Sequence, residues 1–208
     1  MTENNNPTQV NSLNPPILVV ISGPSGVGKD SVIKQLKLLG KDWHFTVTTT
    51  TRKQRPAEEN GVDYYFLDEG SFRNKIDSGE FLEFAEVYGH LYGIPKNQVV
   101  NALRDGLDVI VKTDVQGART IKGKVQDAVL IFLVPPSSQD LRNRLLSRQT
   151  ESKEDMNLRL GAASKELSNM SVFDHVVIND NLETASSKIE SIITVEKCRT
   201  PPRQIRFL

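Results

Sequence analysis

The stretch ILVVISGPSGVGKDSV, residues 17–32, decides the fold of this chain. It begins with a continuous apolar and largely β-branched run, which is typical of a strand buried on both faces of a parallel sheet. A glycine-rich turn follows, and apolar residues then recur at helical spacing from Val32 to Leu39, with Gly40 suited to the helix end. A strand, a turn and a helix in this order predict an α/β fold.

The glycine-rich turn is nearly a phosphate-binding loop, G-x-x-x-x-G-K-[ST]. Its glycines allow backbone N–H groups to converge on an anion at the helix N-terminus, and Lys29 can reach the outer phosphates. The hydroxyl expected directly after Lys29 is missing, because Asp30 stands there and Ser31 comes one place late. Carboxylates are good Mg²⁺ ligands, so we interpret the loop as working and Asp30 as a candidate metal ligand.

Two other glycine motifs are excluded at this turn. A dinucleotide fingerprint needs a third glycine where Ser31 stands, and a nucleophile elbow centred on Ser25 needs glycine where Val27 stands. An ordinary glycine-rich strand-to-helix turn is the remaining alternative. The buried strand before it and the amphipathic helix after it favour phosphate binding.

Composition and charge exclude several classes of protein. The 208 residues include 26 basic and 26 acidic side chains, so no global field attracts nucleic acid or an anionic membrane. The single cysteine excludes an internal disulfide framework, and none of the three histidines has a metal-like neighbour. No apolar run approaches the length of a membrane span, and the N-terminus lacks the apolar core of a signal peptide. We therefore expect a soluble, cytoplasmic protein that binds neither nucleic acid nor membrane. The oligomeric state does not follow from the sequence, and both a monomer and a homodimer are expected as possibilities.

The rest of the chain predicts a three-layer α/β sandwich with a parallel core sheet. Further buried-strand patterns occur at 107–114, 128–134 and 174–178, and helical patterns at 95–105, 115–124, 137–148, 153–170 and 182–198. Residues 44–93 hold more turns, most of the tyrosines and shorter strand-like pieces at 63–68 and 81–88. We interpret them as a small lobe inserted into the core, and residues 1–16, rich in Asn and Pro, as a flexible tail.

The inserted lobe contains a candidate second phosphate site. In TVTTTTRKQRPAEENGVDYYF, residues 46–66, Arg52 and Arg55 lie three apart and Tyr64 follows. Arginine forks match phosphate oxygens, and a phenol adds a neutral donor. A solvated surface hairpin is the alternative. A phosphotransfer enzyme needs a site for the acceptor phosphate, and this favours the functional interpretation.

Five motifs together carry a family resemblance. GPSGVGK, T-T-R-x-x-R-P…E-x-N-G-x-D-Y-x-F, F-L-E-F-A, Y-G-x-P and D-V-Q-G-A occur in one order, and on them the chain resembles a guanylate kinase from about Ile17 to Lys197. The resemblance implies transfer of the terminal phosphoryl group of ATP to GMP with Mg²⁺, and a P-loop nucleoside monophosphate kinase fold. It also implies a core (17–45, 98–136 and 161–208), a GMP-binding lobe (46–97) and a helical lid (137–160).

The resemblance also assigns site residues, position by position. ATP would be bound by Gly23, Pro24, Ser25, Gly26, Val27, Gly28, Lys29, Asp30, Ser31 and Asn179. The GMP phosphate would be held by Arg52, Arg55, Tyr64 and Tyr92, and guanine would be met by Thr48, Glu83 and Asp114. Lys29 and three lid arginines, Arg144, Arg148 and Arg159, would stabilise the transferring group.

Physical chemistry supports some of these roles and leaves alternatives open. The Glu83 carboxylate can accept from N1–H and the exocyclic amine of guanine together, a pattern that adenine cannot offer. Without the resemblance, Glu83 would be interpreted as a solvated strand residue, the two tyrosines as core filling and the lid arginines as a solvated helical face. Asn179 or Asp180 could simply cap the next helix.

Three positions depart from the family pattern: Asp30, Ile94 and Lys112. Ile94 replaces a hydroxyl residue that helps to hold the base, and Lys112 replaces an aspartate. Lys112 could turn away and pair with an acid such as Asp114 or Glu86, or point inward and donate to guanine O6. We favour the first arrangement, because burying an ammonium costs desolvation.

Two other functions remain as alternatives. A kinase of the same fold could act on another phosphorylated acceptor, such as a ribose bisphosphate, and Ile94 and Lys112 leave room for this. A non-catalytic guanylate-kinase-like module could bind peptides instead. The intact Lys29 and lid arginines argue against the module, while Glu83 and the segment around Tyr64 argue against another acceptor.

Overall fold

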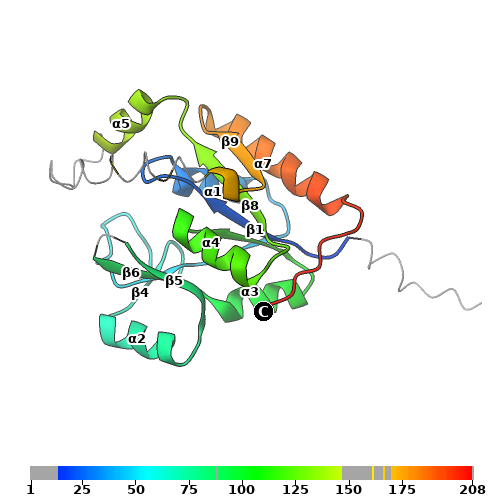
Figure 1. The fold of residues 1–208 in the computed structure, drawn as a ribbon. Helices are drawn as coiled ribbons and strands as arrows, with labels where there is room; N and C mark the ends of the chain where they lie inside the picture. The colour runs from blue at the N-terminus through cyan, green and yellow to red at the C-terminus, as the bar shows by residue number, and fades with distance from the viewer. Residues whose placement is uncertain (1–13, 88, 147–160, 162–165, 167–169, 208) are drawn as a thin grey trace, which may run out of the picture.

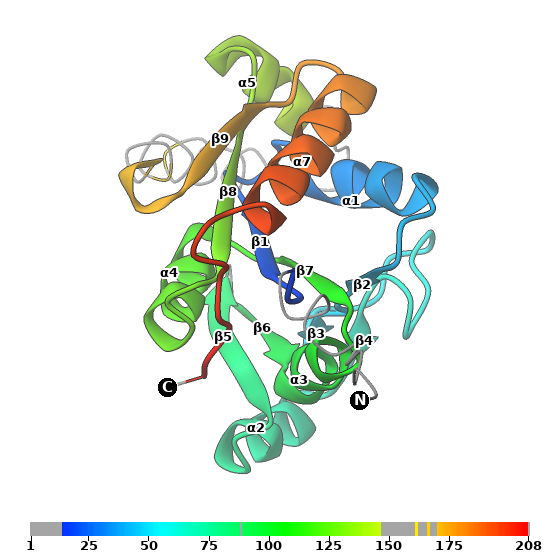
Figure 2. The ribbon, with the colours of Figure 1, turned by 90° about the vertical axis from the view of Figure 1, so that its right-hand side faces the viewer.

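The structure, a computed structural model, describes residues 14–87, 89–146, 161, 166 and 170–207. Its larger sheet has five parallel strands in the order β2-β7-β1-β8-β9 (Figure 2). These strands are β1 (Leu18–Ser22), β2 (Trp43–Phe45), β7 (Asp108–Lys112), β8 (Val129–Val134) and β9 (His175–Ile178). The four strands predicted from the sequence are confirmed as β1, β7, β8 and β9. The prediction that the fourth is buried is wrong, because β9 lies at the edge of the sheet and only Val177 of its residues is buried.

Helices cover both faces of this sheet. One face of β1, with Val19 and Ile21, packs in one apolar cluster with α1 (Lys29–Leu38) and α7 (Leu182–Lys197). The other face, with Leu18 and Val20, packs with α3 (Lys96–Arg104) and α4 (Val115–Lys124). Figure 1 shows the two helix pairs on opposite sides of the strands. The predicted three-layer sandwich is confirmed, and burial of both faces explains why β1 is continuously apolar.

A second sheet is built by the lobe residues, in the order β4-β3-β6-β5. Its strands are β3 (Thr49–Thr50), β4 (Tyr65–Phe66), β5 (Phe81–Val87) and β6 (His90–Pro95). Helix α2 (Glu69–Asp77) packs on it through Phe72, whose ring stacks on Phe81 at a centroid distance of 4.6 Å. The strand-like pieces predicted at 63–68 and 81–88 are confirmed as β4 and β5, but β3, β6 and α2 were not predicted. Helix α2 has a local signal, because Asp68 caps it by accepting from Ser71 N at 2.8 Å.

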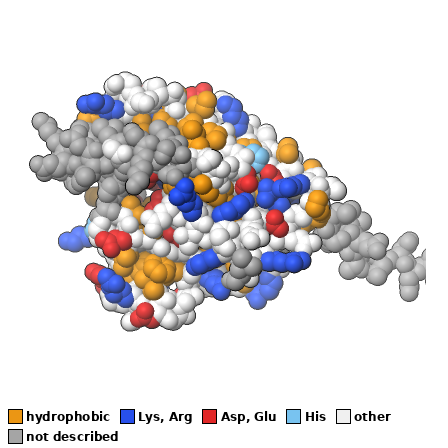
Figure 3. All heavy atoms as spheres, viewed as in Figure 1, with side chains coloured by type: hydrophobic (Ala, Val, Ile, Leu, Met, Phe, Trp, Pro, Cys, Tyr) orange, Lys and Arg blue, Asp and Glu red, His pale blue; other side chains and the backbone are white. Residues whose placement is uncertain are grey.

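The remaining helical patterns are partly described. Helix α5 (Ser138–Leu146) begins where the pattern at 137–148 predicted it. The pattern at 153–170 lies almost wholly outside the described residues, and a short 3₁₀ helix, η2 (Met170–Val172), follows it. No helix in the described part of the chain is long and apolar enough to cross a membrane. The face in Figure 3 carries basic and acidic side chains in several places, as the charge balance suggests.

The C-terminal residues pack against the core and are held there by hydrogen bonds and apolar contacts. Arg203 Nε donates to Glu196 Oε2 of α7 at 2.7 Å, and Glu196 Oε1 lies 2.7 Å from His175 Nε2 on β9. Ile205 and Phe207 then pack against the cluster that contains α3 and α4. This buried network ties the end of the chain to an edge strand of the sheet.

The carboxyl ends of the parallel strands decide where a ligand can bind. The phosphate-loop sequence follows β1, Thr113 and Asp114 follow β7, and Asn179 follows β9. In open α/β sheets ligands bind outside the carboxyl ends of the strands. The topology therefore gathers three separate motifs at one edge.

Candidate active site

The loop between β1 and α1 has the backbone of an anion-binding turn. Gly23 and Gly28 have φ angles of 148° and 100°, which other residues rarely adopt. A Cβ at Gly23 would lie 2.4 Å from the Leu133 carbonyl oxygen, and one at Gly28 would lie 2.6 Å from Asn179 Nδ2. Both glycines are therefore required by space as well as by conformation.

Lys29, the first residue of α1, folds back over this loop. Its Nζ donates to the carbonyl oxygens of Gly23 at 2.5 Å and Pro24 at 3.2 Å. Burial lowers the pKa of the ammonium, and the Glu166 and Asp30 carboxylates oppose this effect. The cation thus lies at the loop, as phosphate binding requires. Ser31, by contrast, is exposed on α1 and does not line the cavity described below.

Asn179 and Arg144 hold the loop from the opposite side. The Asn179 side chain is 2% exposed and donates from Nδ2 to the Val27 carbonyl at 2.7 Å. Arg144 of α5 donates to the same carbonyl at 3.0 Å and to Asn179 O at 2.8 Å. The alternative that Asn179 or Asp180 caps α7 is wrong, because Asn181 is the N-cap. Arg148 and Arg159 lie outside the described residues.

Glu166 is a site residue that the sequence patterns missed. Its Oε2 accepts from Ser25 N of the phosphate loop at 3.3 Å. Burial raises the pKa of this carboxyl, and the Lys29 ammonium lowers it. The Glu166 carboxylate thus accepts a hydrogen bond from an N–H group that could instead donate to a phosphate oxygen. No local motif marked Glu166 within its helical pattern.

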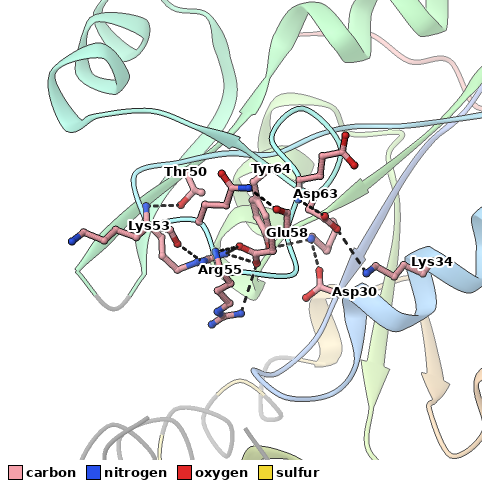
Figure 4. A network of polar contacts seen from close by, with 12 residues as sticks. Asp30, Lys34, Thr50, Lys53, Arg55, Glu58, Asp63 and Tyr64 are labelled. Atoms are coloured by element: carbon pink, nitrogen blue, oxygen red, sulfur yellow. Dashed lines mark hydrogen bonds and ion pairs between the residues drawn. The ribbon is translucent and has the colours of Figure 1, made fainter. Parts of the chain in front are cut away.

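The two arginines of the lobe converge on one carboxylate, Glu58 (Figure 4). Arg52 Nη2 donates to both Glu58 oxygens, at 2.7 and 3.0 Å, and Arg55 N donates to Oε2 at 2.9 Å. The Arg52 guanidinium also lies over the Tyr64 ring, 5.4 Å from its centroid. The Tyr64 and Tyr92 rings meet edge to face at 6.3 Å. This arrangement can bind another anion in place of the Glu58 carboxylate. The anion must offer two acceptor oxygens, as a planar carboxylate or a tetrahedral phosphate does.

A buried carboxylate lies deeper in the lobe. Glu83 of β5 is 3% exposed, so the alternative of a solvated strand residue is wrong. Burial and the neighbouring Asp114 carboxylate raise the pKa of Glu83 to about 7. The Thr113 hydroxyl donates to its Oε2 at 3.3 Å. The absence of a side chain at Gly117 provides space for this carboxylate, because a Cβ at Gly117 would lie 2.6 Å from Glu83 Oε1.

Two more polar residues, Thr48 and Asp114, line the same cavity as Glu83. Thr48 Oγ1 is buried and, within the described residues, has no hydrogen-bond partner. An unpaired buried hydroxyl costs free energy unless a ligand satisfies it. Asp114 caps α4 by accepting from Gly117 N at 2.7 Å, which fixes its carboxylate near Glu83.

One cavity of about 350 Å³ is lined both by residues of the phosphate loop and by Glu83 of the lobe. Of the described residues, its lining includes Lys29, Asp30 and Glu166 beside the phosphate loop. Residues of the lobe and of the end of β7 complete it: Thr48, Arg52, Arg55, Tyr64, Glu83, Tyr92, Ile94, Lys112, Thr113 and Asp114. The tyrosines therefore line the cavity and do not simply fill the core.

Comparison with known proteins agrees with this arrangement. A family model described as guanylate kinase matches residues 16–196. The chain belongs to the guanylate kinase family. It is 44% identical over 183 residues to a guanylate kinase of Clostridium tetani, with 88% of each chain covered. It is also 44% identical over 187 residues to one of Thermotoga maritima, with 90% of each covered. A crystal structure of guanylate kinase from Anaplasma phagocytophilum matches with a TM-score of 0.77 and 30% identity, covering 90% of this chain and 89% of that one.

Two departures of this guanylate kinase from the family pattern contact each other. Lys112 Nζ donates to Asp30 Oδ1 and, at 3.1 Å, to the Tyr64 hydroxyl. The predicted pairing of Lys112 with Asp114 or Glu86 is therefore wrong. Its acidic partner is Asp30 of α1, while the Asp114 carboxylate accepts from Gly117 N. Donation to guanine O6 stays a prediction. The third departure, Ile94, is 1% exposed and packs in the apolar cluster of α3 and α4.

Proposed function

We propose that this guanylate kinase binds ATP at the loop between β1 and α1 and GMP in the lobe beside it. One observation carries this assignment: Lys29 of the phosphate loop and the buried Glu83 carboxylate line the same cavity. A donor phosphate at the loop and a guanine at Glu83 would then place the acceptor phosphate between them, where Arg52 and Arg55 lie.

Guanine recognition is assigned to three polar residues at the deep end of the cavity. The Glu83 carboxylate accepts from N1–H and the exocyclic amine, and Asp114 adds a further acceptor nearby. The buried Thr48 hydroxyl gains the partner that it lacks among the described residues. Adenine presents no N1–H, so it would leave Glu83 and Thr48 unsatisfied.

The acceptor phosphate takes the place that the Glu58 carboxylate now occupies between Arg52 and Arg55. The Tyr64 and Tyr92 hydroxyls complete the set as neutral donors. An oxygen of this phosphate attacks the γ-phosphorus of ATP in line, and the bond to the bridging β–γ oxygen breaks. Because the attacking group is already anionic, the step needs no general base.

Lys29 and the lid arginines stabilise charge on the phosphoryl group in transit. Arg144 also holds Val27 and Asn179, so it links α5 to the geometry of the phosphate loop. We assign the same transition-state role to Arg148 and Arg159. The division into a core, a GMP-binding lobe over 46–97 and a lid over 137–160 remains part of this proposal, as does a cytoplasmic location.

Magnesium is proposed to arrive with ATP, where it neutralises phosphate charge. Kinases usually hold Mg²⁺ through one or two carboxylates together with substrate phosphates. Within the described residues no group of three or more His, Cys, Asp or Glu could hold a metal by itself. The Asp30 carboxylate, in the first turn of α1, fits the single-carboxylate arrangement.

Release of ADP, measured in a coupled assay, tests the choice of acceptor. The panel contains GMP, AMP, CMP and ribose 1,5-bisphosphate, each with ATP and Mg²⁺. We expect turnover with GMP to exceed that with the other acceptors by at least about 100-fold, because the analogues leave buried polar groups unpaired. Preference for the bisphosphate would instead support the alternative acceptor class. No turnover with any acceptor would support the binding module.

A further inference from the structure

Lys112 lies between the two phosphate sites. Towards the proposed GMP site, its Nζ is 3.1 Å from the Tyr64 hydroxyl and 4.5 Å from the centroid of the Tyr64 ring. Towards the proposed ATP site, the same Nζ donates a hydrogen bond to Asp30, the residue that directly follows Lys29. Figure 4 shows Asp30 facing the loop that carries Glu58 and Tyr64. The ammonium therefore connects the start of α1 to the acceptor lobe.

The surroundings of Lys112 keep it charged and fixed. Its side chain is 17% exposed, whereas that of Asp30 is 55% exposed. Burial disfavours the ammonium, but the Asp30 carboxylate and the Tyr64 phenol outweigh burial and raise the pKa of Lys112. An ion pair with so exposed a partner contributes little to stability. Structural support alone is therefore a weak reason for placing a cation in this cavity.

The groups around Lys112 are those assigned to phosphate binding. The Tyr64 ring contacts both Lys112 and the guanidinium of Arg52, and all three side chains line the cavity. By contrast, the contacts of Glu83 are to Thr113 and, electrostatically, to Asp114 and Lys124. Lys112 thus belongs to the phosphate end of the cavity, and its contacts are not with the base end.

We propose that Lys112 binds the phosphate of the acceptor nucleotide and that Asp30 positions the Lys112 ammonium for this contact. The inference rests on the proposed function, because it presumes that the acceptor phosphate lies beside Tyr64. An ammonium there also screens the repulsion between the acceptor phosphate and the γ-phosphate of ATP. Lys112 is then a catalytic residue that touches substrate. Asp30 positions Lys112 through Oδ1, in addition to the contact with Mg²⁺ proposed above.

Binding of GMP and of guanosine, measured without ATP by isothermal titration, separates a phosphate contact from a base contact. We expect Lys112→Met to weaken GMP binding about 10- to 100-fold, the range for loss of a charge-assisted hydrogen bond, and to leave guanosine binding unchanged. Lys112→Arg should keep most of the GMP affinity because it keeps the cation. The matched control is Lys34→Met, since Lys34 is a 70% exposed lysine on α1 that lies 3.9 Å from Asp63.

Asp30→Asn tests the positioning role. We expect weaker GMP binding with unchanged guanosine binding, and no further loss when it is combined with Lys112→Met. Undiminished GMP binding in Lys112→Met, or an equal loss for guanosine, would overturn the inference. Additive losses in the double variant would overturn the role of Asp30. Failure of the proposed function is distinguishable, because the wild-type protein would then not prefer GMP in the ADP-release panel.

Discussion

The side-chain amide of Asn179 donates to the carbonyl of Val27, across 152 positions of sequence, at 2.7 Å. The bond joins the residue after β9 to the middle of the phosphate loop. Because Asn179 is almost fully buried, neither group can exchange this partner for water. The shape of the loop therefore depends on a residue from the far end of the sheet.

The Asn179→Ala variant tests this dependence. It leaves the Val27 carbonyl with only its Arg144 contact among the interactions described above. We expect the Michaelis constant for ATP to rise up to about tenfold, with a smaller change for GMP, since one hydrogen bond contributes roughly 0.5–1.5 kcal/mol. The control is Asn181→Ala, which removes the N-cap of α7. This control variant should lower the free energy of unfolding by about 1 kcal/mol and leave the Michaelis constant for ATP unchanged.

The pKa of Glu83 predicts a pH dependence of GMP binding. The carboxyl must be ionised to accept from guanine, and its pKa is raised to about 7 by burial and by Asp114. GMP affinity should therefore increase from pH 6 to pH 8 and then level off, as measured by titration calorimetry. Glu83→Gln should remove most of the affinity and the part of this dependence that belongs to Glu83. The remaining part comes from the phosphate of GMP, whose second pKa is about 6. An affinity that is flat across this range would contradict the assignment of Glu83.

The same shift has a consequence for stability. A carboxyl whose pKa is higher in the folded than in the unfolded state favours folding when protonated, and this contribution is lost as pH rises from about 4.5 to about 7. Glu83→Gln should therefore be more stable than wild type at pH 8, by on the order of 3 kcal/mol at most. Thermal unfolding at pH 5 and pH 8 checks this, and the difference between the two proteins should shrink at the lower pH.

Gly117 and Gly123 form a matched pair on α4. A Cβ at Gly117 would lie 2.2 Å from Thr113 Oγ1 and 2.6 Å from Glu83 Oε1, whereas one at Gly123 meets nothing within 4 Å. Gly117→Ala should therefore lower kcat/KM for GMP at least about tenfold by displacing Glu83. Gly123→Ala should leave kcat/KM unchanged and add about 0.5–1 kcal/mol of stability. Equal activity of the two variants would refute the close packing at Gly117.

The buried network at Glu196 predicts loss of stability in acid. Burial opposes ionisation of this carboxyl, but its hydrogen bonds to Arg203 and His175 dominate and lower its pKa to about 2. This contribution is present above about pH 4.5 and is lost as pH falls toward 2. Glu196→Gln should lower the melting temperature at pH 7 and flatten its fall in acid. A parallel shift of the two acid profiles would argue against the network.

The sequence predicted the core better than the lobe, for a physical reason. Strands such as Leu18–Ser22 are buried on both faces, so their apolar runs are continuous and recognisable. Helix α2 was missed because only Phe72 of its residues is buried, which leaves little apolar periodicity. The two-residue strands β3 and β4 carry even less pattern.

The candidate site was predictable where motifs are local and not where contacts are distant. The phosphate loop and the Arg52–Arg55 spacing are visible in a few residues. Glu166 reaches Ser25 across 141 positions, and Lys112 reaches Asp30 across 82, so no local pattern could identify either pair. The predicted partners of Lys112, Asp114 or Glu86, were wrong, because the acid that pairs with it comes from α1, a distant part of the chain.

Transfer of a labelled γ-phosphoryl group from ATP to GMP is the most direct measurement of the central claim. We predict that label leaves ATP and appears in GDP, one GDP for each ADP, only when Mg²⁺ is present. Lys29→Met should slow this transfer by at least about 100-fold, the scale for loss of a key charge stabiliser. ADP formation without labelled GDP, or transfer at a near-normal rate in Lys29→Met, would contradict the account.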